Sequence, residues 1–219
     1  MTDTPAGVEI LDVYDEAGNR TGSLPRDQVH QQGLWHPVFH CQIVADRSGV
    51  ATAVLQLRSR HKAAFPGLLD VSSAGHLAAG ETPIDGLREL DEELGVRPDV
   101  SALVELGVRR LVDDSGEGRL NREMVHAFLL RDDRPLSQYR VQPEEVEDVF
   151  DAPIDGLLCL LHGEQATLTV DGVLDAGHPQ ARPQTRTIER HHLVPSDGYW
   201  TVLMVMAERF MAGKRSLAI

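Results

Sequence analysis

The sequence predicts a single α/β or α+β domain in which a mixed sheet packs against a few helices. Short apolar runs with strand character, bounded by Gly, Asp and Pro, recur along the chain. Helical spacing of apolar residues occurs in only a few segments, and there is no internal repeat or low-complexity tract. With 219 residues, 42% of them hydrophobic, the chain is long enough to bury a real core.

The first half of the chain is expected to be mostly strands. Residues 9–22 predict two short strands around a Gly-Asn turn, and the polar residues 26–36 predict a linker or short helix. Apolar runs predict strands at 38–45 and 50–59, separated by an Asp-Arg-Ser-Gly turn. Residues 68–75 predict a short strand that leads through a Gly-rich loop into a helix.

The second half continues the mixed pattern. Strands are expected at about 103–112 and 123–130, joined by the Gly- and Asp-rich turn 113–121. Residues 144–150 predict another strand, and residues 153–162 predict a short apolar helix.

The remaining tail carries no motif of known chemistry. Residues 167–175 predict a hairpin, 178–186 a mobile Pro- and Gln-containing stretch, and 198–213 a last helix. Because that helix is apolar nearly all round, we expect it to pack on the domain or on a second subunit, which favours a homodimer. The expected organisation is a domain over 1–162 and an extension over 163–219.

Charge and composition argue against several classes of partner. The net charge of −13 disfavours a nucleic-acid backbone. No apolar run reaches the roughly 18 residues of a membrane span, and the N-terminus has no secretory signal. Cys41 and Cys159 lie far apart and outside any metal-binding spacing, so we expect reduced thiols in a cytoplasmic protein.

A helix is expected over 82–95 from its end signals. Thr82 suits the N-cap, Pro83 the first helical position, and Asp85 completes a capping box. Gly95 is the expected residue just past the C-terminal end. The core-facing stripe is expected to comprise Ile84, Leu87, Leu90 and Leu94.

Three glutamates cluster on one side of this helix near its end. Glu89, Glu92 and Glu93 are three and four residues apart, a spacing at which like charges repel by roughly 0.2–0.5 kcal/mol per pair. The negative end of the helix dipole adds a further cost. One interpretation is a solvated acidic face. The other is a bound divalent cation, because hard cations prefer carboxylate oxygens.

Residues 75–96 resemble the Nudix box, GX5EX7REUXEEXGU, in which U is aliphatic. The matching positions are Gly75, Glu81, Arg88, Glu89, Leu90, Glu92, Glu93, Gly95 and Val96. The resemblance implies a Nudix-type α/β/α sandwich with a mixed sheet, elaborated here by the C-terminal hairpin and helix. It also implies Mg²⁺-dependent hydrolysis of a nucleoside diphosphate linked to another moiety, with Mn²⁺ as an alternative cofactor.

The sequence departs from the family pattern at one point. Six residues separate Glu81 from Arg88, where the family has seven. One residue fewer turns everything downstream by about 100° relative to the helix start. We expect the loop or first turn, with Gly86, to absorb the change. The Glu81–Arg88 ion pair of the family is therefore in question, and the metal site is not.

The resemblance also implies roles for the acidic residues. Glu89 and Glu93 would be metal ligands, and Glu92 a ligand or the group that activates water. The Gly75 region would offer a backbone carbonyl. A glutamate from a later loop often completes such sites, and we favour Glu145 for this role.

Stretches outside the box, within residues 8–160, are similar to the isopentenyl-diphosphate-isomerase-like branch of the superfamily. His36 and His76 match metal-binding histidines of the isomerases, and His30 is a looser match for a third. With a glutamate such as Glu145, these histidines would form a second site suited to a transition metal.

The same likeness bears on substrate and reaction. Arg58 and Lys62 align with residues that grip the diphosphate in the isomerases, and a guanidinium fork beside an ammonium suits that group. The catalytic cysteine of the isomerases falls at Ala74. We therefore expect no isomerase chemistry, whereas hydrolysis needs only metal and water.

Three functions remain open at this point. The leading one is a hydrolase of a small-molecule diphosphate, and the second is a non-catalytic ligand sensor on the same fold. The intact glutamates disfavour the sensor, and Ala74 disfavours the isomerase. Loops that set specificity, such as 113–122 and 163–197, carry no signal that names the substrate.

Overall fold

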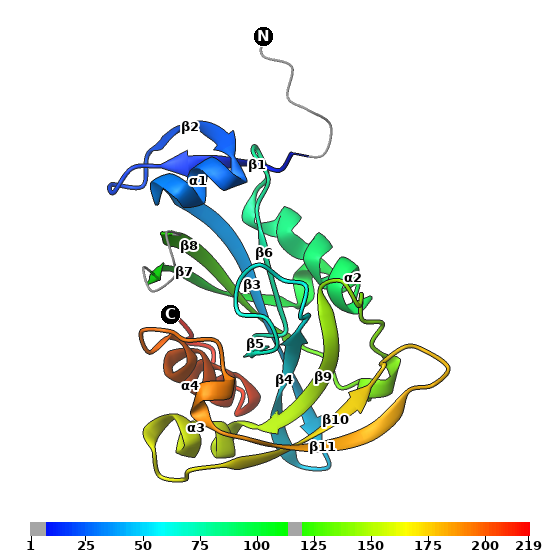
Figure 1. Ribbon diagram of the computed structural model, residues 1–219. Helices are drawn as coiled ribbons and strands as arrows, with labels where there is room; N and C mark the ends of the chain where they lie inside the picture. The colour runs from blue at the N-terminus through cyan, green and yellow to red at the C-terminus, as the bar shows by residue number, and fades with distance from the viewer. Residues whose placement is uncertain (1–7, 114–119) are drawn as a thin grey trace.

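The computed structural model describes residues 8–113 and 120–219 (Figure 1). The turn expected at 113–121 lies largely outside these ranges. Helices in the described part are α1 Arg26–Gln32, α2 Leu87–Leu94, α3 Ile154–His162 and α4 Tyr199–Met211. Strands are β1 Ile10–Tyr14, β2 Arg20–Pro25, β3 Trp35–Arg47, β4 Val50–Arg58, β5 Leu69–Asp70, β6 Ser73–His76, β7 Leu103–Asp113, β8 Asn121–Arg131, β9 Val146–Pro153, β10 Leu168–Leu174 and β11 Arg182–Ile188.

The strands join in one sheet whose main path runs β11-β10-β9-β4-β3-β1-β2. β5 pairs with β4, β6 and β8 pair with β3, and β7 pairs with β8. β3 and β8 run parallel over ten residue pairs, whereas the other pairs of named strands are antiparallel. The expected mixed sheet is therefore confirmed.

Two hydrophobic layers cover opposite faces of this sheet. Successive side chains of a strand point to opposite faces, so β3 contributes to both layers. Phe39 and Ile43 join the cluster that contains Leu90 of α2, while Val38 and Val44 join the one that contains α3 and α4. Figure 1 shows α2 on one side of the sheet and α3 with α4 on the other. The expected α/β/α layering is confirmed.

The prediction of a hairpin at 167–175 is wrong. β10 runs straight through this segment and pairs with β11, which overlaps the stretch 178–186 that was expected to be mobile. Asp-Gly is a hairpin-turn signal, but Gly172 serves a close approach instead. A Cβ added there would lie 2.4 Å from Cδ1 of Phe150 on β9.

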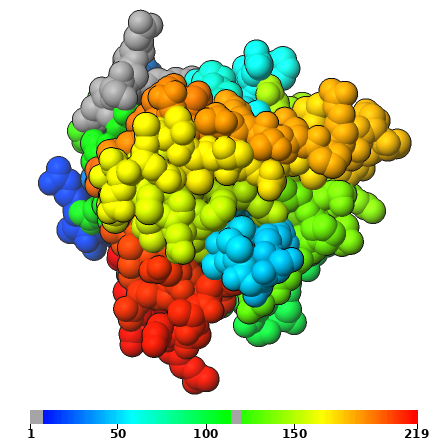
Figure 2. All heavy atoms as spheres, turned by 90° about the horizontal axis from the view of Figure 1, so that it is seen from below, coloured from blue at the N-terminus to red at the C-terminus, as the bar shows by residue number. Residues whose placement is uncertain are grey.

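The last helix packs within its own chain. Leu203 and Met204 of α4 are buried in the cluster shared with α3 and β4. Figure 2 shows α4, in red, beside the yellow and orange residues of the tail on one face of the molecule. The homodimer stays a prediction. No helix of the described residues is long and apolar enough to cross a bilayer.

Candidate functional site

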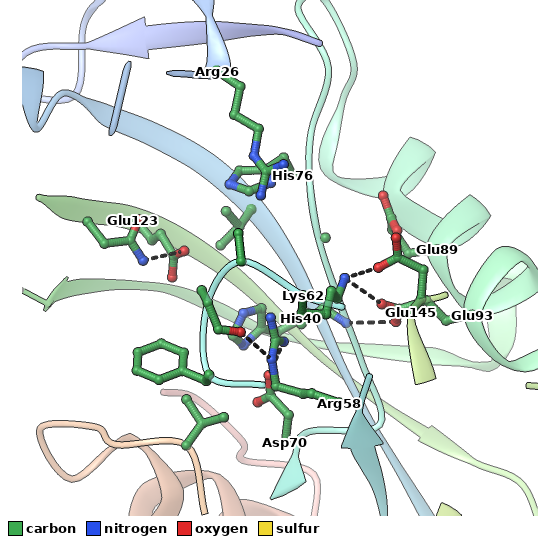
Figure 3. Close-up of a pocket in the computed structure, with 18 of the residues that line it drawn as sticks. Arg26, His40, Arg58, Lys62, Asp70, His76, Glu89, Glu93, Glu123 and Glu145 are labelled. Atoms are coloured by element: carbon green, nitrogen blue, oxygen red, sulfur yellow. Dashed lines mark hydrogen bonds and ion pairs between the residues drawn. The ribbon is translucent and has the colours of Figure 1, made fainter. Parts of the chain in front are cut away.

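The predicted site residues surround one cavity of about 750 Å³ between α2, β6, β8 and the loop that follows β4 (Figure 3). Its lining includes Arg58, Lys62, Gly75, His30, His76, Glu89, Glu92, Glu93 and Glu145. His36 does not line the cavity, but its ring packs against those of His30 and His76. The structure thus brings together residues from five separate stretches of the sequence.

The shortened spacer of the box changes the helix start and keeps the ion pair. A 3₁₀ turn, Pro83–Gly86, precedes α2 and takes up the missing residue. Gly86 lies so close to Phe39 that an added Cβ would be 2.5 Å from the Phe39 Cβ. Arg88 Nε donates to Glu81 Oε1 at 2.8 Å, so the pair in question is present.

The same 3₁₀ turn corrects two details of the expected helix. Ile84 does not join the core-facing stripe and is 36% exposed, because the tighter turn points it away from α2's buried side. Since α2 begins only at Leu87, Glu89 lies in its first turn, where the helix dipole favours a negative charge. Gly95 ends the helix in the left-handed conformation, as expected.

Glu93 is the most deeply buried carboxylate of the cavity, with 1% of the residue exposed. Its Oε2 accepts a hydrogen bond from the backbone N–H of Ala74 at 3.2 Å and a longer one from Gln56 Nε2 at 3.5 Å. Burial raises the pKa of Glu93 to about 8, although the nearby Lys62 ammonium opposes that shift. A negative charge at Glu93 therefore needs a cation beside it.

Glu89 depends on the absence of a side chain at Gly75. A Cβ on Gly75 would lie 2.1 Å from Cδ of Glu89, so the carboxylate rests directly on β6. Arg88 Nη1 contacts Glu89 Oε1 and holds the carboxylate from the other side. Burial raises the pKa of Glu89, and the guanidinium of Arg88 opposes this effect. The glycine of the box is thus required to seat a glutamate of the box.

Lys62 lies between two of the predicted metal ligands. Its ammonium contacts Glu145 Oε2 and is 3.8 Å from Glu93 Oε1 (Figure 3). Glu92 is the most solvent-exposed of the box glutamates, and its Oε2 is 3.5 Å from Arg88 Nη1. Glu89, Glu93 and Glu145 therefore face one cavity, and Lys62 is the internal counter-ion of Glu93 and Glu145.

Arg58 is already paired inside the cavity. Its Nη1 donates to Asp70 Oδ2 at 2.7 Å, and both side chains are largely buried. Asp70 also accepts the backbone N–H of Val71, which fixes its direction. Arg58 is therefore held rigidly at the cavity wall, with its charge partly balanced.

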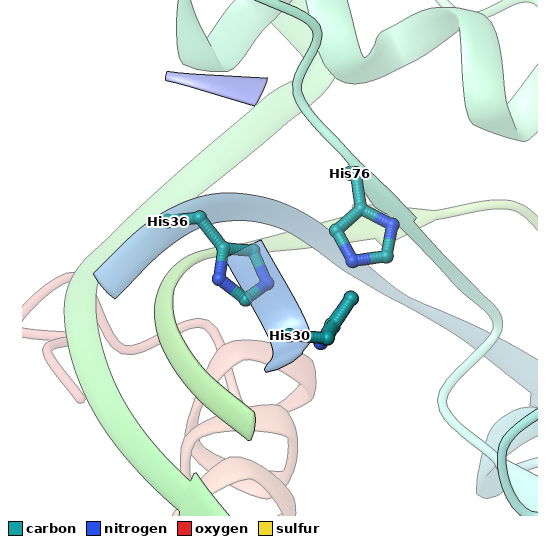
Figure 4. Close-up of side chains that lie close together, drawn as sticks. All are labelled: His30, His36 and His76. Atoms are coloured by element: carbon teal, nitrogen blue, oxygen red, sulfur yellow. The ribbon is translucent and has the colours of Figure 1, made fainter. Parts of the chain in front are cut away.

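His30, His36 and His76 form a compact group (Figure 4). One ring nitrogen of each lies within 4.8 Å of the others. His36 Nδ1 bonds the carbonyl oxygen of Leu34 at 2.9 Å, which leaves its Nε2 for another partner. Burial lowers the pKa of both His36 and His76, so these rings are neutral and able to ligate. Glu145 does not belong to this group.

Both groups of side chains fit a cation by their chemistry. In the described residues, Glu93 Oε1 is buried without a hydrogen-bond partner, as are His36 Nε2 and His76 Nε2. Buried polar atoms seldom stay unpaired. The carboxylates offer oxygen ligands of the kind Mg²⁺ prefers, whereas three imidazoles suit a transition metal.

Several cavity residues had not been identified from the sequence. Asn121 and Glu123 lie two apart on β8 and share a face, a period-2 signal that was available. His40 interrupts the apolar run of β3, which was a second available signal. Asp70 carried none, because its long-range contact with Arg58 places it at the cavity, and neither did Tyr199, which does not line the cavity but contacts His40.

Comparison with known proteins gives consistent matches. The family model of the NUDIX domain matches residues 34–166. An uncharacterised Nudix hydrolase of Clostridium acetobutylicum is 29% identical over 197 residues, which cover 90% of this chain and 95% of that protein.

Two further likenesses concern the branch and the fold. An isopentenyl-diphosphate Delta-isomerase of Mycolicibacterium vanbaalenii is 37% identical over 98 residues, covering 44% of this chain and 51% of the isomerase. A crystal structure from Deinococcus radiodurans matches with a TM-score of 0.55 at 21% identity, over 72% of this chain and 91% of that chain. The latter likeness supports the fold alone.

Proposed function

Since this chain belongs to the Nudix hydrolase family, whose members act on acid anhydrides, we propose that it hydrolyses a small organic diphosphate with Mg²⁺ or Mn²⁺. The substrate is a nucleoside diphosphate derivative or another molecule with that linkage. The observation that carries the proposal is the convergence of Glu89, Glu93 and Glu145 on one cavity. Buried carboxylates in such a group are stable only beside positive charge.

The residues divide the work of the reaction. Glu89, Glu93 and Glu145 would hold the cation, together with a backbone carbonyl near Gly75. A bound divalent cation neutralises the diphosphate and lowers the pKa of a coordinated water. Glu92 is a further ligand or the base that takes the proton of the water.

The reaction itself balances with water alone. The water oxygen forms a bond to one phosphorus, and the bridging P–O bond breaks. The electron pair of that bond leaves with the second phosphate, and the proton of the water passes to the carboxylate base. Arg58 and Lys62 would bind the phosphate oxygens, exchanging part of their contact with Asp70 and Glu145 for the substrate.

The three histidines would form a second metal site at the other end of the cavity. The support for this site is the grouping of His30, His36 and His76 and the unpaired Nε2 atoms of the last two. Imidazole nitrogens bind Zn²⁺ and other transition metals well. The carboxylate site does not depend on it.

Two other functions stay as alternatives. A ligand sensor would bind a diphosphate without turning it over, which the complete glutamate set disfavours. An isomerase would need an acid to protonate an alkene, and the position of the expected thiol is Ala74, whose backbone N–H bonds Glu93 instead. Cys41, fully buried, does not line the cavity.

Phosphate and nucleotide release from a panel of diphosphates, with and without Mg²⁺, tests the proposal. Glu93→Gln should lower kcat by about two to three orders of magnitude, the scale of losing one transition-state stabiliser. Glu147→Gln is the matched control, since Glu147 bonds Arg60 outside the cavity. Metal-free binding without any turnover would support the sensor instead, and proton exchange into isopentenyl diphosphate would support the isomerase.

A further inference from the structure

The chain beyond the family-matched region reaches the cavity. The family model ends at residue 166, yet Val194 lines the cavity wall. The Val194 N–H donates to the carbonyl of Leu69 at 2.9 Å, and Leu193 pairs with Leu69 in a parallel bridge. The tail is therefore attached to β5, the strand that carries Asp70, the partner of Arg58.

A second contact links the tail to His40, which lines the cavity. The hydroxyl of Tyr199, in the first turn of α4, lies 3.2 Å from Nδ1 of His40 on β3. Tyr199 is 3% exposed, and the two rings meet edge to face with centroids 5.6 Å apart. His40 lines the cavity, and Figure 3 shows its ring near Arg58.

We assign the protonated nitrogen of His40 from this contact. Burial lowers the pKa of His40 and raises that of Tyr199, so both rings are neutral. A buried phenol O–H is stabilised by donating to an acceptor, and His40 Nδ1 lies within reach, so we assign the phenol as the donor. His40 is then protonated at Nε2, and that N–H is the donor left to meet a ligand.

The surroundings of His40 favour a hydroxyl-rich ligand. Glu123 also lines the cavity, where Asn121 Nδ2 donates to its Oε1 at 2.7 Å, and Asp70 stands beside Arg58. Asp70 is already buried and bonded to Arg58, but an alkyl chain placed there would remove Glu123 from water without replacing the lost hydrogen bonds, at a high cost. A sugar offers hydroxyls that donate to Glu123 and accept from His40.

We propose that His40, positioned by Tyr199 from the C-terminal tail, selects substrates whose diphosphate carries a sugar. The Nε2–H of His40 donates to a sugar hydroxyl, and Glu123 accepts from another. Tyr199 is a positioning residue that acts only through His40. This proposal rests on the proposed function for the diphosphate, but it assigns the selection of the organic group to residues outside the Nudix box.

Calorimetric binding in the presence of Mg²⁺ tests the pair with probes that cannot be hydrolysed. The sugar probes are the α,β-methylene analogues of ADP-ribose and UDP-glucose. Methylenediphosphonate has no organic group, and a methylene-bridged isopentenyl analogue has no hydroxyl. Wild type should bind at least one sugar probe more tightly than either of the last two. The absence of that preference overturns the proposal.

The variants separate selection from general damage. Tyr199→Phe and His40→Leu should weaken binding of the preferred sugar probe by about 3- to 10-fold, the worth of one hydrogen bond. Methylenediphosphonate binding should stay within about twofold. His40→Gln, which keeps an N–H donor, should recover most of the loss. Tyr139→Phe is the control, because the buried Tyr139 hydroxyl has no hydrogen-bond partner among the described residues.

Two results would overturn the proposed roles of His40 and Tyr199. Equal weakening of the sugar probe and methylenediphosphonate would place His40 on the phosphates, and unchanged sugar binding in Tyr199→Phe would remove the role of the tail. Tyr199→Phe deletes a single oxygen atom, so it decides the question even if His40→Leu fails to fold. Failure of the hydrolase function would show separately, as no turnover of any diphosphate by wild type.

Discussion

The two ends of the cavity hold cation ligands in opposite ways. At the carboxylate end, Lys62 pairs with Glu93 and Glu145 and Arg88 pairs with Glu89, so its charges are partly balanced from inside the chain. The histidine end is formed by His30, His36 and His76. Burial lowers the pKa of His36 and His76, which keeps these two rings neutral. A metal ion that binds at the carboxylate end must therefore displace the Lys62 ammonium. At the histidine end, a metal ion displaces no cation.

The same difference appears in how the ends are encoded. Two acids of the carboxylate end, Glu89 and Glu93, come from α2, and Gly75 leaves room for Glu89. The histidines come from α1, β3 and β6 and meet only when the sheet has formed. Charge and origin together predict two sites that can be altered independently, one for a hard cation and one for a transition metal.

The largest expected effect comes from Gly75→Ala. The new Cβ would overlap Glu89, so the carboxylate or the strand must move, and we expect kcat to fall about 100-fold or more. Overpacking of this kind also costs about 1–3 kcal/mol of unfolding free energy. Kinetics with Mg²⁺ and urea denaturation measure both effects.

Gly22→Ala is the matched control for that substitution. Nothing lies within 4 Å of a Cβ at Gly22, which is also on a strand and outside the cavity. Full activity in Gly75→Ala would show that Glu89 does not need its present position. The carboxylate end would then be less constrained than its geometry indicates.

His76→Ala tests the independence of the two ends. Losing one of three nitrogen ligands should weaken binding of Zn²⁺ or Co²⁺ by more than about 100-fold, since even the loss of an outer-shell partner costs 10–100-fold. The absorption spectrum of bound Co²⁺ and equilibrium dialysis with Zn²⁺ measure the change. Turnover with Mg²⁺ should be affected much less.

His191→Ala provides the comparison for His76→Ala, because His191 is an exposed histidine that contacts Glu189 away from this group. If His191→Ala weakens Zn²⁺ binding as much as His76→Ala does, the ions bind to surface histidines and the buried group is not a site. A parallel loss of Mg²⁺-dependent turnover in His76→Ala would instead join the two ends into one functional unit.

Local signals in the sequence were sufficient for the box. Capping by Thr82 and Asp85, the left-handed Gly95 and the acids of α2 all depend on neighbours within a few residues. The mixed sheet followed from strand-like runs in the same way. We expected the loop or the first turn to absorb the one-residue deletion before Arg88, and the 3₁₀ turn agrees with that expectation. The exposure of Ile84 in this turn was not expected.

Features that depend on contacts between distant residues could not be predicted from the sequence. Asp171-Gly172 has the composition of a turn, and only the ring of Phe150, more than twenty residues earlier, explains why that glycine lies in a strand. The Tyr199–His40 contact joins residues 159 positions apart. Lys62 was expected to face a diphosphate, and its present contact with Glu145 depends on how two loops meet.

The smallest expected effect concerns pH and the residue between the two ends. Burial lowers the pKa of His40 below its unfolded value, with Asp70 and Glu123 opposing and Arg58 supporting the shift. As pH falls below about 6.5, the unfolded chain therefore gains a proton that folded His40 resists, and the free energy of unfolding decreases. His40→Leu lacks this contribution. Urea denaturation at pH 7.5 and pH 5 should show a smaller loss of stability in His40→Leu than in wild type. Equal losses in the two proteins would mean that His40 has the same pKa in the folded state as in the unfolded chain. The ring of His40 would then be open to water.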